Sequence, residues 1–595
     1  MAEKLTNEQQ AAVDSRERSL LVSAAAGSGK TKVLVERLFS YVEREGANLD
    51  DFLIITYTRA AASELRGKIA KALTERMERD PGNYHLRQQM LRVYRADIKT
   101  VDAFCTALLR ENCHLLGEDA RGHALRPDFR VLDENEAQVL RERVLARTLD
   151  DFYDCLTTGS TLLADTLGAG RDDSALEDLV LELHAKLQAQ PYEDKWLEAQ
   201  RAFWRAVPDK IENTPYGKIL LNEVRRKARH CKNLLQRAAQ EMCANDALNQ
   251  KYAPAFLDAS YQLEALEGKT AEGWDAARGV TIAFPRLAAV KDSDGGEMKA
   301  RMKSLWDNCK ETVKGFAEIF SASSDEAVED LRTMAPAMLA LIDLTADFSR
   351  RYNEEKRRRN SADFSDQEHE AIRLLIGEDG APTELARIVS ARYREIMVDE
   401  YQDTNEVQNR IFDAISCKGE NLFTVGDVKQ SIYRFRLADP RIFLQHYNTW
   451  PPLEDAEEHD SAKLLLSRNF RSRKEVLDAT NFIFCNILSE EMGELDYGAD
   501  EMLRLGANYV ESSACGAEFH LLDLPTQTGE QRVRASEAEA AFVADYISDM
   551  LTSEFPIQDD KTKELRPVRE EDIVILMRSP STRLLDYRRA LEARC

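Results

Sequence analysis

Two short segments of this chain carry residue types and spacings that suit phosphate chemistry. In the first, small residues surround a lysine in the run Ala24-Ala25-Ala26-Gly27-Ser28-Gly29-Lys30-Thr31. Small side chains and glycines let backbone N–H groups approach phosphate oxygens. We expect the whole run to bind ATP, with Lys30 reaching the β- and γ-phosphates and the Thr31 hydroxyl binding Mg²⁺. The usual pattern begins with glycine where this chain has Ala24, which makes the motif slightly less specific.

The second segment is an acidic pair at the end of an apolar run. Residues 396–398 read Ile-Met-Val and are followed by Asp399 and Glu400. Open α/β sheets place ligand chemistry at the carboxyl ends of their strands. We therefore expect Asp399 to hold Mg²⁺ and Glu400 to orient the water that attacks the γ-phosphate. The alternative is a solvated turn or a helix cap, which the presence of a phosphate loop in the same chain makes less attractive.

The elements that must position these residues alternate between strands and helices. Apolar runs predict strands over 20–22, 52–55, 98–101, 396–398 and 422–425. Between about 130 and 360 the apolar period becomes helical, for example over 176–187, 196–207 and 334–348. A strand pattern that stops and resumes predicts a parallel α/β sheet with an all-helical insertion. Further strands over 519–522 and 573–576 predict a second sheet domain that begins near residue 465.

Length and composition are those of a large globular chain. Its 595 residues are too many for one core, and 43% hydrophobic with 31% charged residues is typical of globular domains. No segment resembles a signal peptide or a membrane span, so we expect a cytoplasmic protein. The ten cysteines show no metal-site or disulfide spacing, and we expect them to be reduced and mostly buried.

Charge alone does not decide whether the chain binds nucleic acid. The net charge of −24 excludes a surface that is basic throughout, but phosphate contacts can be confined to a channel. The basic run from Lys356 to Arg359 is a candidate phosphate contact. It could equally be the solvated end of a helix, where cations suit the dipole.

Residues 426–436 combine an amide with aromatic side chains after a predicted strand. Gln430 could sense the γ-phosphate, and Tyr433 and Phe435 would share a face of an extended segment. Aromatic rings on such a face can stack on bases at about 1–3 kcal/mol per base. The same rings could instead be core residues. Their proximity to Gln430 favours a nucleic-acid contact that responds to the nucleotide.

Several further segments resemble the motifs of superfamily 1A helicases of the UvrD, Rep and PcrA kind, and among them the AddA branch of helicase–nuclease subunits. Residues 5–9 resemble the Q motif, 55–65 motif Ia, 100–105 the motif that follows it, and 469–472 motif IV. The resemblance implies adenine contacts by Gln9, Lys32 and Phe470. It also implies an Arg471 contact to the γ-phosphate and DNA contacts by Thr58, Arg59 and Phe104. Arg59 and Asp102 depart from the residues that are usual there.

The resemblance further implies an architecture and an activity. The fold would be α/β, with RecA-like P-loop NTPase motor domains built on parallel sheets and a large all-helical insertion. Residues 1–120 and 361–450 would form motor domain 1A, 121–360 the helical insertion 1B, and 451–595 the first part of motor domain 2A. The activity would be ATP- and Mg²⁺-dependent 3′ to 5′ translocation on single-stranded or duplex DNA in double-strand-break repair.

Such a protein would form a heterodimer with an AddB-like nuclease subunit, and it would itself carry an exonuclease domain. That domain and the later motor motifs would lie beyond residue 595, so we expect a fragment that binds nucleotide and hydrolyses it slowly. An RNA helicase of superfamily 1 and a P-loop ATPase switch that does not translocate remain as alternatives.

Overall fold

A computed structural model describes residues 5–119, 121–167, 173–291, 296–416, 419–434, 437–510, 516–524, 534–559 and 562–594. The side chains of 491 and 492 are not described. The chain divides into two compact units. One comprises residues 1–117, 126–128 and 364–595, and the other residues 118–125 and 129–363.

The first unit is built on a six-stranded sheet in which every strand pair is parallel. The strands in spatial order are β3 (Asp97–Thr100), β2 (Phe52–Thr56), β6 (Glu395–Val398), β7 (Leu422–Gly426), β1 (Leu20–Ala24) and β8 (Ala462–Leu466). Five of them were predicted from apolar runs, although Val101 begins a helix rather than ending β3. Strand β8 was not predicted.

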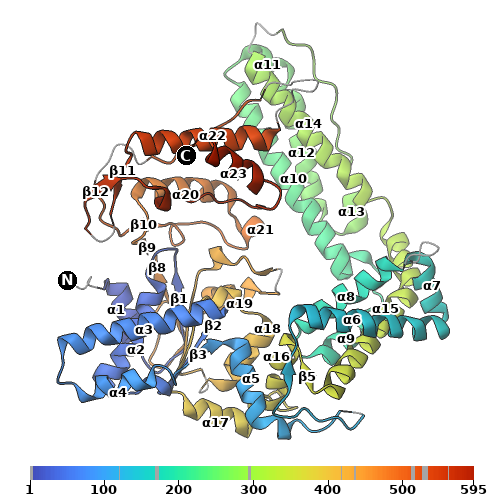
Figure 1. Cartoon of the computed structure of the whole chain (residues 1–595). Coiled ribbons are helices and arrows are strands. Elements are labelled where there is room, and N and C mark those ends of the chain that lie inside the picture. Colours follow the sequence, from blue (N-terminus) through green and yellow to red (C-terminus); the bar gives the residue numbers. More distant parts are fainter. Residues whose placement is uncertain are drawn as a thin grey trace. The chain divides into compact units, whose positions relative to one another are not determined.

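Helices cover this sheet and complete its core (Figure 1). They are α1 (Asn7–Asp14), α2 (Lys30–Glu45), α3 (Arg59–Arg79), α4 (Tyr84–Arg92), α5 (Val101–Asn112), α16 (Phe364–Leu375), α17 (Glu384–Arg392), α18 (Glu406–Ile415) and α19 (Pro440–Thr449). Leu34 and Leu38 of α2 are buried in one apolar cluster with Leu20, Val22 and Phe423 of the sheet. The predicted α/β fold class is confirmed.

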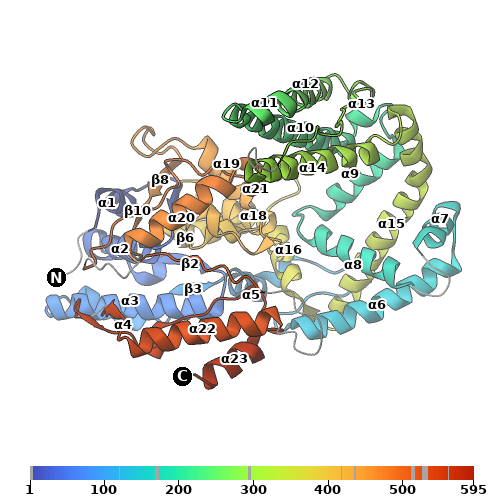
Figure 2. The same ribbon diagram turned by 90° about the horizontal axis from the view of Figure 1, so that it is seen from above.

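Residues beyond 466 form smaller elements. The helices are α20 (Lys474–Ile487), α21 (Glu490–Gly493), α22 (Ala535–Thr552) and α23 (Leu584–Glu592), of which the last two lie side by side in Figures 1 and 2. The strands form two pairs, β9 (Arg468–Asn469) with β10 (Arg504–Leu505) and β11 (Pro556–Gln558) with β12 (Leu565–Pro567).

The predicted strands over 519–522 and 573–576 are wrong for this structure. Neither segment is a strand, and Phe519, Leu521 and Leu576 are 90%, 82% and 91% exposed. A β-strand requires a neighbour to accept and donate its backbone hydrogen bonds. Within the described residues neither segment has such a neighbour, so their apolar side chains alone do not make them strands.

In the described residues of the second unit the regular elements are helices, apart from a short strand pair, β4 (Arg130–Val131) with β5 (Ser361–Ala362). Its helices are α6 (Glu134–Asp154), α7 (Thr158–Leu167), α8 (Ser174–Gln188), α9 (Glu193–Arg205), α10 (Pro215–Met242), α11 (Asp246–Lys251), α12 (Ala253–Lys269), α13 (Trp274–Arg278), α14 (Gly296–Ile319) and α15 (Ser324–Arg358). Helices α10, α12 and α14 run side by side (Figure 1) around a core that contains Phe256 and Trp306.

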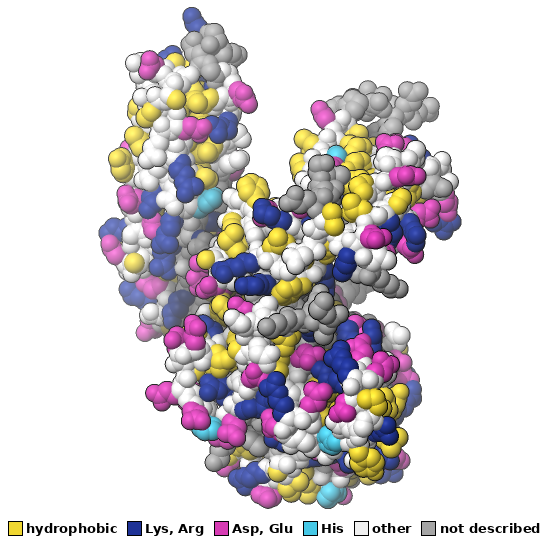
Figure 3. Space-filling model, turned by 90° about the vertical axis from the view of Figure 1, so that its left-hand side faces the viewer, with side chains coloured by type: hydrophobic (Ala, Val, Ile, Leu, Met, Phe, Trp, Pro, Cys, Tyr) yellow, Lys and Arg dark blue, Asp and Glu magenta, His cyan; other side chains and the backbone are white. Residues whose placement is uncertain are grey.

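The basic run at residues 356–359 ends helix α15. Lys356 is buried and donates to Asp363 at 2.9 Å, while Arg358 and Arg359 donate to Glu355. These contacts favour the helix-end interpretation over phosphate binding. Acidic and basic side chains are intermixed on the face of the molecule drawn in Figure 3.

Two further findings concern membranes and metals. In the described part of the chain, no helix has both the length and the apolar character needed to span a membrane. The described residues also contain no group of three or more His, Cys, Asp or Glu side chains placed to hold a metal ion. Of the seven cysteines that are described, all are free and four are buried.

Candidate functional site

The phosphate loop connects strand β1 to helix α2 in a conformation that only glycine adopts easily. Gly27 has φ +69° and Gly29 has φ +86°, both in the left-handed region. A Cβ on Gly27 would lie 2.7 Å from Nδ2 of Asn469, so a side chain there would also collide with a neighbour. Gly29 is the N-cap of α2 and supplies no side-chain cap. The first N–H groups of α2 therefore remain available for an anion.

Lys30 and Glu400 meet although they lie far apart in the sequence. Nζ of Lys30 donates to Oε2 of Glu400 at 2.8 Å. Strand β7 separates β1 from β6, and in a parallel sheet the carboxyl ends of these strands lie at one edge. Glu400 has φ +52°, an uncommon conformation for a residue with a Cβ. The ion pair brings the phosphate loop and the acidic pair into one site.

Asp399 is held in a poorly solvated position beside Glu400. Burial, and secondarily the charge of Glu400, raises the pKa of Asp399 to about 6. The same two causes raise the pKa of Asp403 to about 6. Thr31 and Asp399 supply a hydroxyl and a carboxylate oxygen, which are ligands that Mg²⁺ prefers. The chemistry of this donor set fits the predicted metal.

Gln402 connects the acidic pair to the next strand end, although its sequence context gave it no expected role. It is 2% exposed, its Nε2 donates to Oε2 of Glu400 at 2.9 Å, and its Oε1 accepts from the Asp427 N–H at 2.9 Å. Oδ2 of Asp427 in turn accepts from Nε2 of Gln430 at 2.8 Å. A Cβ on Gly426 would collide with Oε1 of Gln402, so this network needs the glycine.

A cleft of about 650 Å³ lies over the phosphate loop and contains most of the predicted ATP-site residues. The lining residues are Ala26, Gly27, Gly29, Lys30, Thr31, Lys32, Val35, Glu36, Lys68, Lys71, Ala72, Glu75, Glu400, Gln430, Phe470 and Arg471. Lys68 and Lys71 of α3 were not among the predicted residues. Because residues three apart lie on the same face of a helix, the sequence could have indicated that these two lysines face one site. Ala24, Ala25 and Ser28 are buried, which places them under the cleft rather than in it.

Gln9 lies behind the phosphate loop rather than in the large cleft. Its Nε2 donates to the Ser28 carbonyl at 2.9 Å, and its Oε1 accepts from the Thr6 N–H at 3.1 Å as part of the capping box of α1. A smaller cavity of about 180 Å³ is lined by Gln9, Ser28 and Phe470, among others. Phe470 also lines the large cleft, so it connects the two.

The predicted DNA contacts differ in accessibility. Thr58 and Arg59 are exposed at the start of α3, where the Thr58 hydroxyl caps the helix by accepting from the Ala61 N–H. Tyr433 is partly buried, and Phe435 lies outside the described residues. Phe104 is 4% exposed in α5. Its predicted DNA contact is corrected here, because a ring packed into the interior offers no face for a base.

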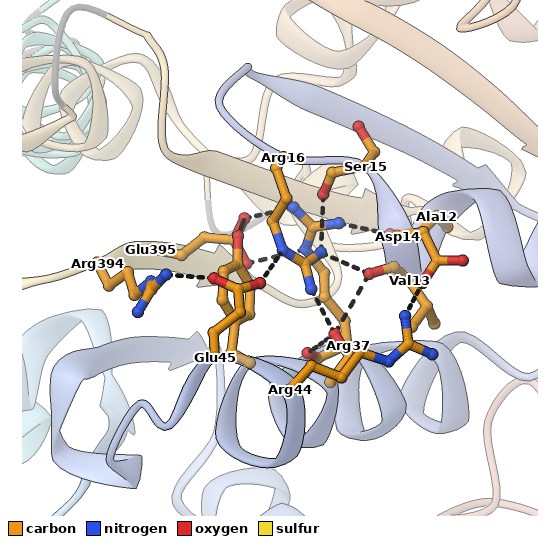
Figure 4. Close-up of polar contacts among 12 residues, drawn as sticks. Ala12, Val13, Asp14, Ser15, Arg16, Arg37, Arg44, Glu45, Arg394 and Glu395 are labelled. Atoms are coloured by element: carbon orange, nitrogen blue, oxygen red, sulfur yellow. Dashed lines mark hydrogen bonds and ion pairs between the residues drawn. The ribbon is translucent and has the colours of Figure 1, made fainter.

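A polar network, buried at Arg37 and Glu395 and exposed around Glu45, holds α1, α2 and the beginning of β6 together (Figure 4). The guanidinium of Arg37 donates to both carboxylate oxygens of Glu395 and, at 2.5 Å, to the Ala12 carbonyl. Arg16 donates to Glu45 at 2.9 Å, and Arg394 donates to the same carboxylate. The helix that follows the phosphate loop is thereby fixed to the strand that ends in the acidic pair.

Comparisons with known proteins agree with this arrangement. A family model described as the UvrD/REP helicase N-terminal domain matches residues 5–451. Proteins named as the A subunit of an ATP-dependent helicase/nuclease are similar over nearly the whole chain. The example from Ruminiclostridium cellulolyticum is 34% identical over 97% of this chain and 49% of its own length. Those from Alkaliphilus oremlandii and Bacillus cytotoxicus are each 35% identical over 96% of this chain and 47% of theirs. The chain thus spans about half the length of these relatives.

Proposed function

The chain belongs to the UvrD/REP helicase N-terminal domain family, and from this premise we propose that it is the nucleotide-hydrolysing part of a DNA-translocating helicase–nuclease. The proposal depends most on one observation, the 2.8 Å contact between Lys30 and Glu400 at the floor of the large cleft. A phosphate-loop lysine that binds the β- and γ-phosphates, beside a carboxylate that can orient the attacking water, suits ATP hydrolysis.

We assign each group one role. Lys30 and the N–H groups at the start of α2 bind the phosphates, and Glu400 orients and polarises the attacking water. Thr31 and Asp399 would hold Mg²⁺, which when bound neutralises charge on the phosphates. Gln430 and Arg471 line the same cleft, and we propose that they contact the γ-phosphate. Gln9, Lys32 and Phe470 are the proposed contacts to the adenosine.

The domain assignment and the nucleic-acid contacts form part of the proposal. We assign residues 1–120 and 361–450 to motor domain 1A, 121–360 to insertion 1B and 451–595 to motor domain 2A, except that strand β8 belongs to the sheet of 1A because it pairs with β1. Thr58, Arg59 and Tyr433 are the proposed DNA contacts, and 3′ to 5′ is the proposed polarity. The names of the relatives describe each of them as one part of a larger enzyme. For the protein to which this chain belongs we propose an AddB-like nuclease partner and a role in double-strand-break repair.

The test uses two variants and a surface control. K30A should abolish binding of a fluorescent ATP analogue with Mg²⁺. E400Q should bind it normally and hydrolyse ATP about 100-fold more slowly. K474A removes a lysine that pairs with the exposed side chain of Asp478, and it should match the wild type in both assays. Normal nucleotide binding by K30A would contradict the proposal.

The nucleic-acid substrate needs a separate assay. Single-stranded DNA should accelerate the ATP turnover of the whole protein to which this chain belongs, whereas RNA of the same sequence should not. The present chain alone should hydrolyse ATP slowly with or without DNA. Equal acceleration by both would favour an RNA helicase or a helicase without sugar preference. No response to either would favour the non-translocating switch.

A further inference from the structure

The side chain of Asn469 joins two segments of the proposed nucleotide site. Asn469 lies in β9 and is 2% exposed. Its Nδ2 donates to the Ala26 carbonyl of the phosphate loop at 2.7 Å. Its Oδ1 accepts from the backbone N–H groups of Arg471 at 2.8 Å and of Ser472 at 2.7 Å. One carboxamide therefore holds the loop on one side and the turn that carries Arg471 on the other.

The backbone makes the same connection. The Phe470 N–H donates to the Gly27 carbonyl at 2.9 Å. A Cβ built on Gly27 would lie 2.7 Å from Nδ2 of Asn469 and 3.0 Å from Cβ of Arg471. The loop and residues 469–471 are thus in direct contact, with no room for a side chain between them.

These contacts fix a peptide group that the nucleotide would meet. Because a trans peptide is planar, its N–H points away from its carbonyl oxygen. The Ala26 carbonyl is turned toward Asn469, so the Gly27 N–H points to the opposite side, as a phosphate-binding loop requires. Hydrogen bonds from a side-chain amide to the next residues also fix the start of the turn that leads to Arg471.

We propose that Asn469 is a positioning residue that sets the conformation of the phosphate loop and the location of Arg471 together. This inference rests on the proposed function, because its role concerns the same nucleotide. The position needs a donor and an acceptor in one planar group. Aspartate keeps the acceptor for the turn but places an oxygen against the Ala26 carbonyl, and serine is too short to reach that carbonyl while still capping the turn.

The experiment compares N469D with a matched control on the complete chain. Asn481 is 7% exposed; its Nδ2 donates to the Leu503 carbonyl at 3.0 Å, and its Oδ1 accepts from the Leu503 N–H and the Tyr497 hydroxyl. N481D therefore introduces the same chemical change away from the phosphate loop. N469D should weaken binding of a fluorescent ATP analogue with Mg²⁺ at least tenfold, whereas N481D should alter it less than twofold.

A second measurement separates positioning from general loss of structure. If Asn469 acts partly through Arg471, adding R471A to N469D should weaken ATP binding less than R471A does in the wild type. Circular dichroism checks folding, and N469S replaces N469D if the aspartate variant does not fold. Binding by a folded N469D or N469S within twofold of the wild type would overturn the proposal for Asn469 alone, as would additive effects with R471A. Failure of the wild type to bind the analogue would overturn the proposed function and this inference together.

Discussion

Replacing Arg37 by alanine should strongly destabilise the contact between α2 and the central sheet. Arg37 is fully buried, and Glu395 is 2% exposed. The guanidinium also lies 4.6 Å from the centre of the Phe423 ring. After the substitution, Glu395 would keep the Tyr41 hydroxyl at 3.1 Å as its one remaining partner from this network. Removing one partner of a buried ion pair costs about 3–5 kcal/mol, because the other charge stays buried without compensation.

Hydrogen exchange is the suitable assay, because a chain of this size need not unfold in one step. Peptides covering residues 33–42 and 395–398 should lose protection by a factor of about 150 or more, which corresponds to about 3 kcal/mol. R44A provides the control on the same helix, since Arg44 and its partner Asp14 are 60% and 43% exposed. Its effect should stay below about 1 kcal/mol.

A double substitution distinguishes the charge from the packing. R37M with E395L removes both charges and keeps much of the volume, so it should cost far less than R37A alone. Protection in R37A within threefold of the wild type would refute the reasoning, since it would mean that Glu395 finds compensation elsewhere. Equal losses in R37A and in the double variant would show that shape rather than charge dominates.

Two further predictions concern the acidic pair. Q402L should lower ATP turnover about 5- to 30-fold, because Glu400 loses a donor and the Asp427 N–H loses its acceptor. Nucleotide affinity should stay within twofold, since Lys30 and the N–H groups of α2 bind the phosphates. Q408L, which removes a similar donor to Glu368 at 2.7 Å, should leave both unchanged, and a Q402L turnover equal to the wild type would contradict this. The raised pKa of Asp399, about 6, means that Mg²⁺ affinity should fall as the pH drops below 6, since the metal requires the carboxylate. Without Mg²⁺, the raised pKa of Asp399 stabilises the folded state below about pH 4, and this stabilisation is lost as the pH rises through 6. D399N cannot ionise, so it should raise the melting temperature at pH 8. No increase in melting temperature there would contradict the pKa shift.

The central strands could be predicted from sequence because their burial is local and continuous. Strands β1, β2, β6 and β7 are apolar runs with turn-forming or charged residues at their ends, as expected for strands covered on both faces. Strand β8 reads Ala-Lys-Leu-Leu-Leu and lies in the range that was assigned to another domain. Its place beside β1 depends on a long-range pairing that its composition does not reveal.

The burial of Phe104 was visible in the sequence. Val101, Phe104, Cys105 and Leu108 recur at the spacing of one helix face, and all four are buried in α5. A motif resemblance gave Phe104 a DNA contact, whereas the helical period indicated a core residue. Here the period was the better guide, because it reports on packing directly.

The roles of Asn469 and Gln402 could not be predicted in the same way. Each makes hydrogen bonds to backbone groups of segments that are distant in sequence, such as Ala26 and Asp427. Every residue except proline carries the same backbone donor and acceptor, so the sequence does not show which backbone groups these side chains will contact. The residues that bind ligands can be recognised by chemistry, whereas those that hold them depend on where the loops lie in space.

The phosphate loop and the acidic pair can lie far apart in sequence at little entropic cost, because both ends of the helical insertion are held together. The chain enters this unit before β4 and leaves it after β5, and these two strands pair in parallel. The Arg130 N–H donates to the Asn360 carbonyl at 3.0 Å, and the Leu132 N–H donates to the Ala362 carbonyl at 2.9 Å. Since the ends of the insertion are held together, its length adds little to the entropy lost when β6 joins the sheet. The insertion therefore adds little to the cost of bringing β6 into the sheet between β2 and β7, where Glu400 reaches Lys30.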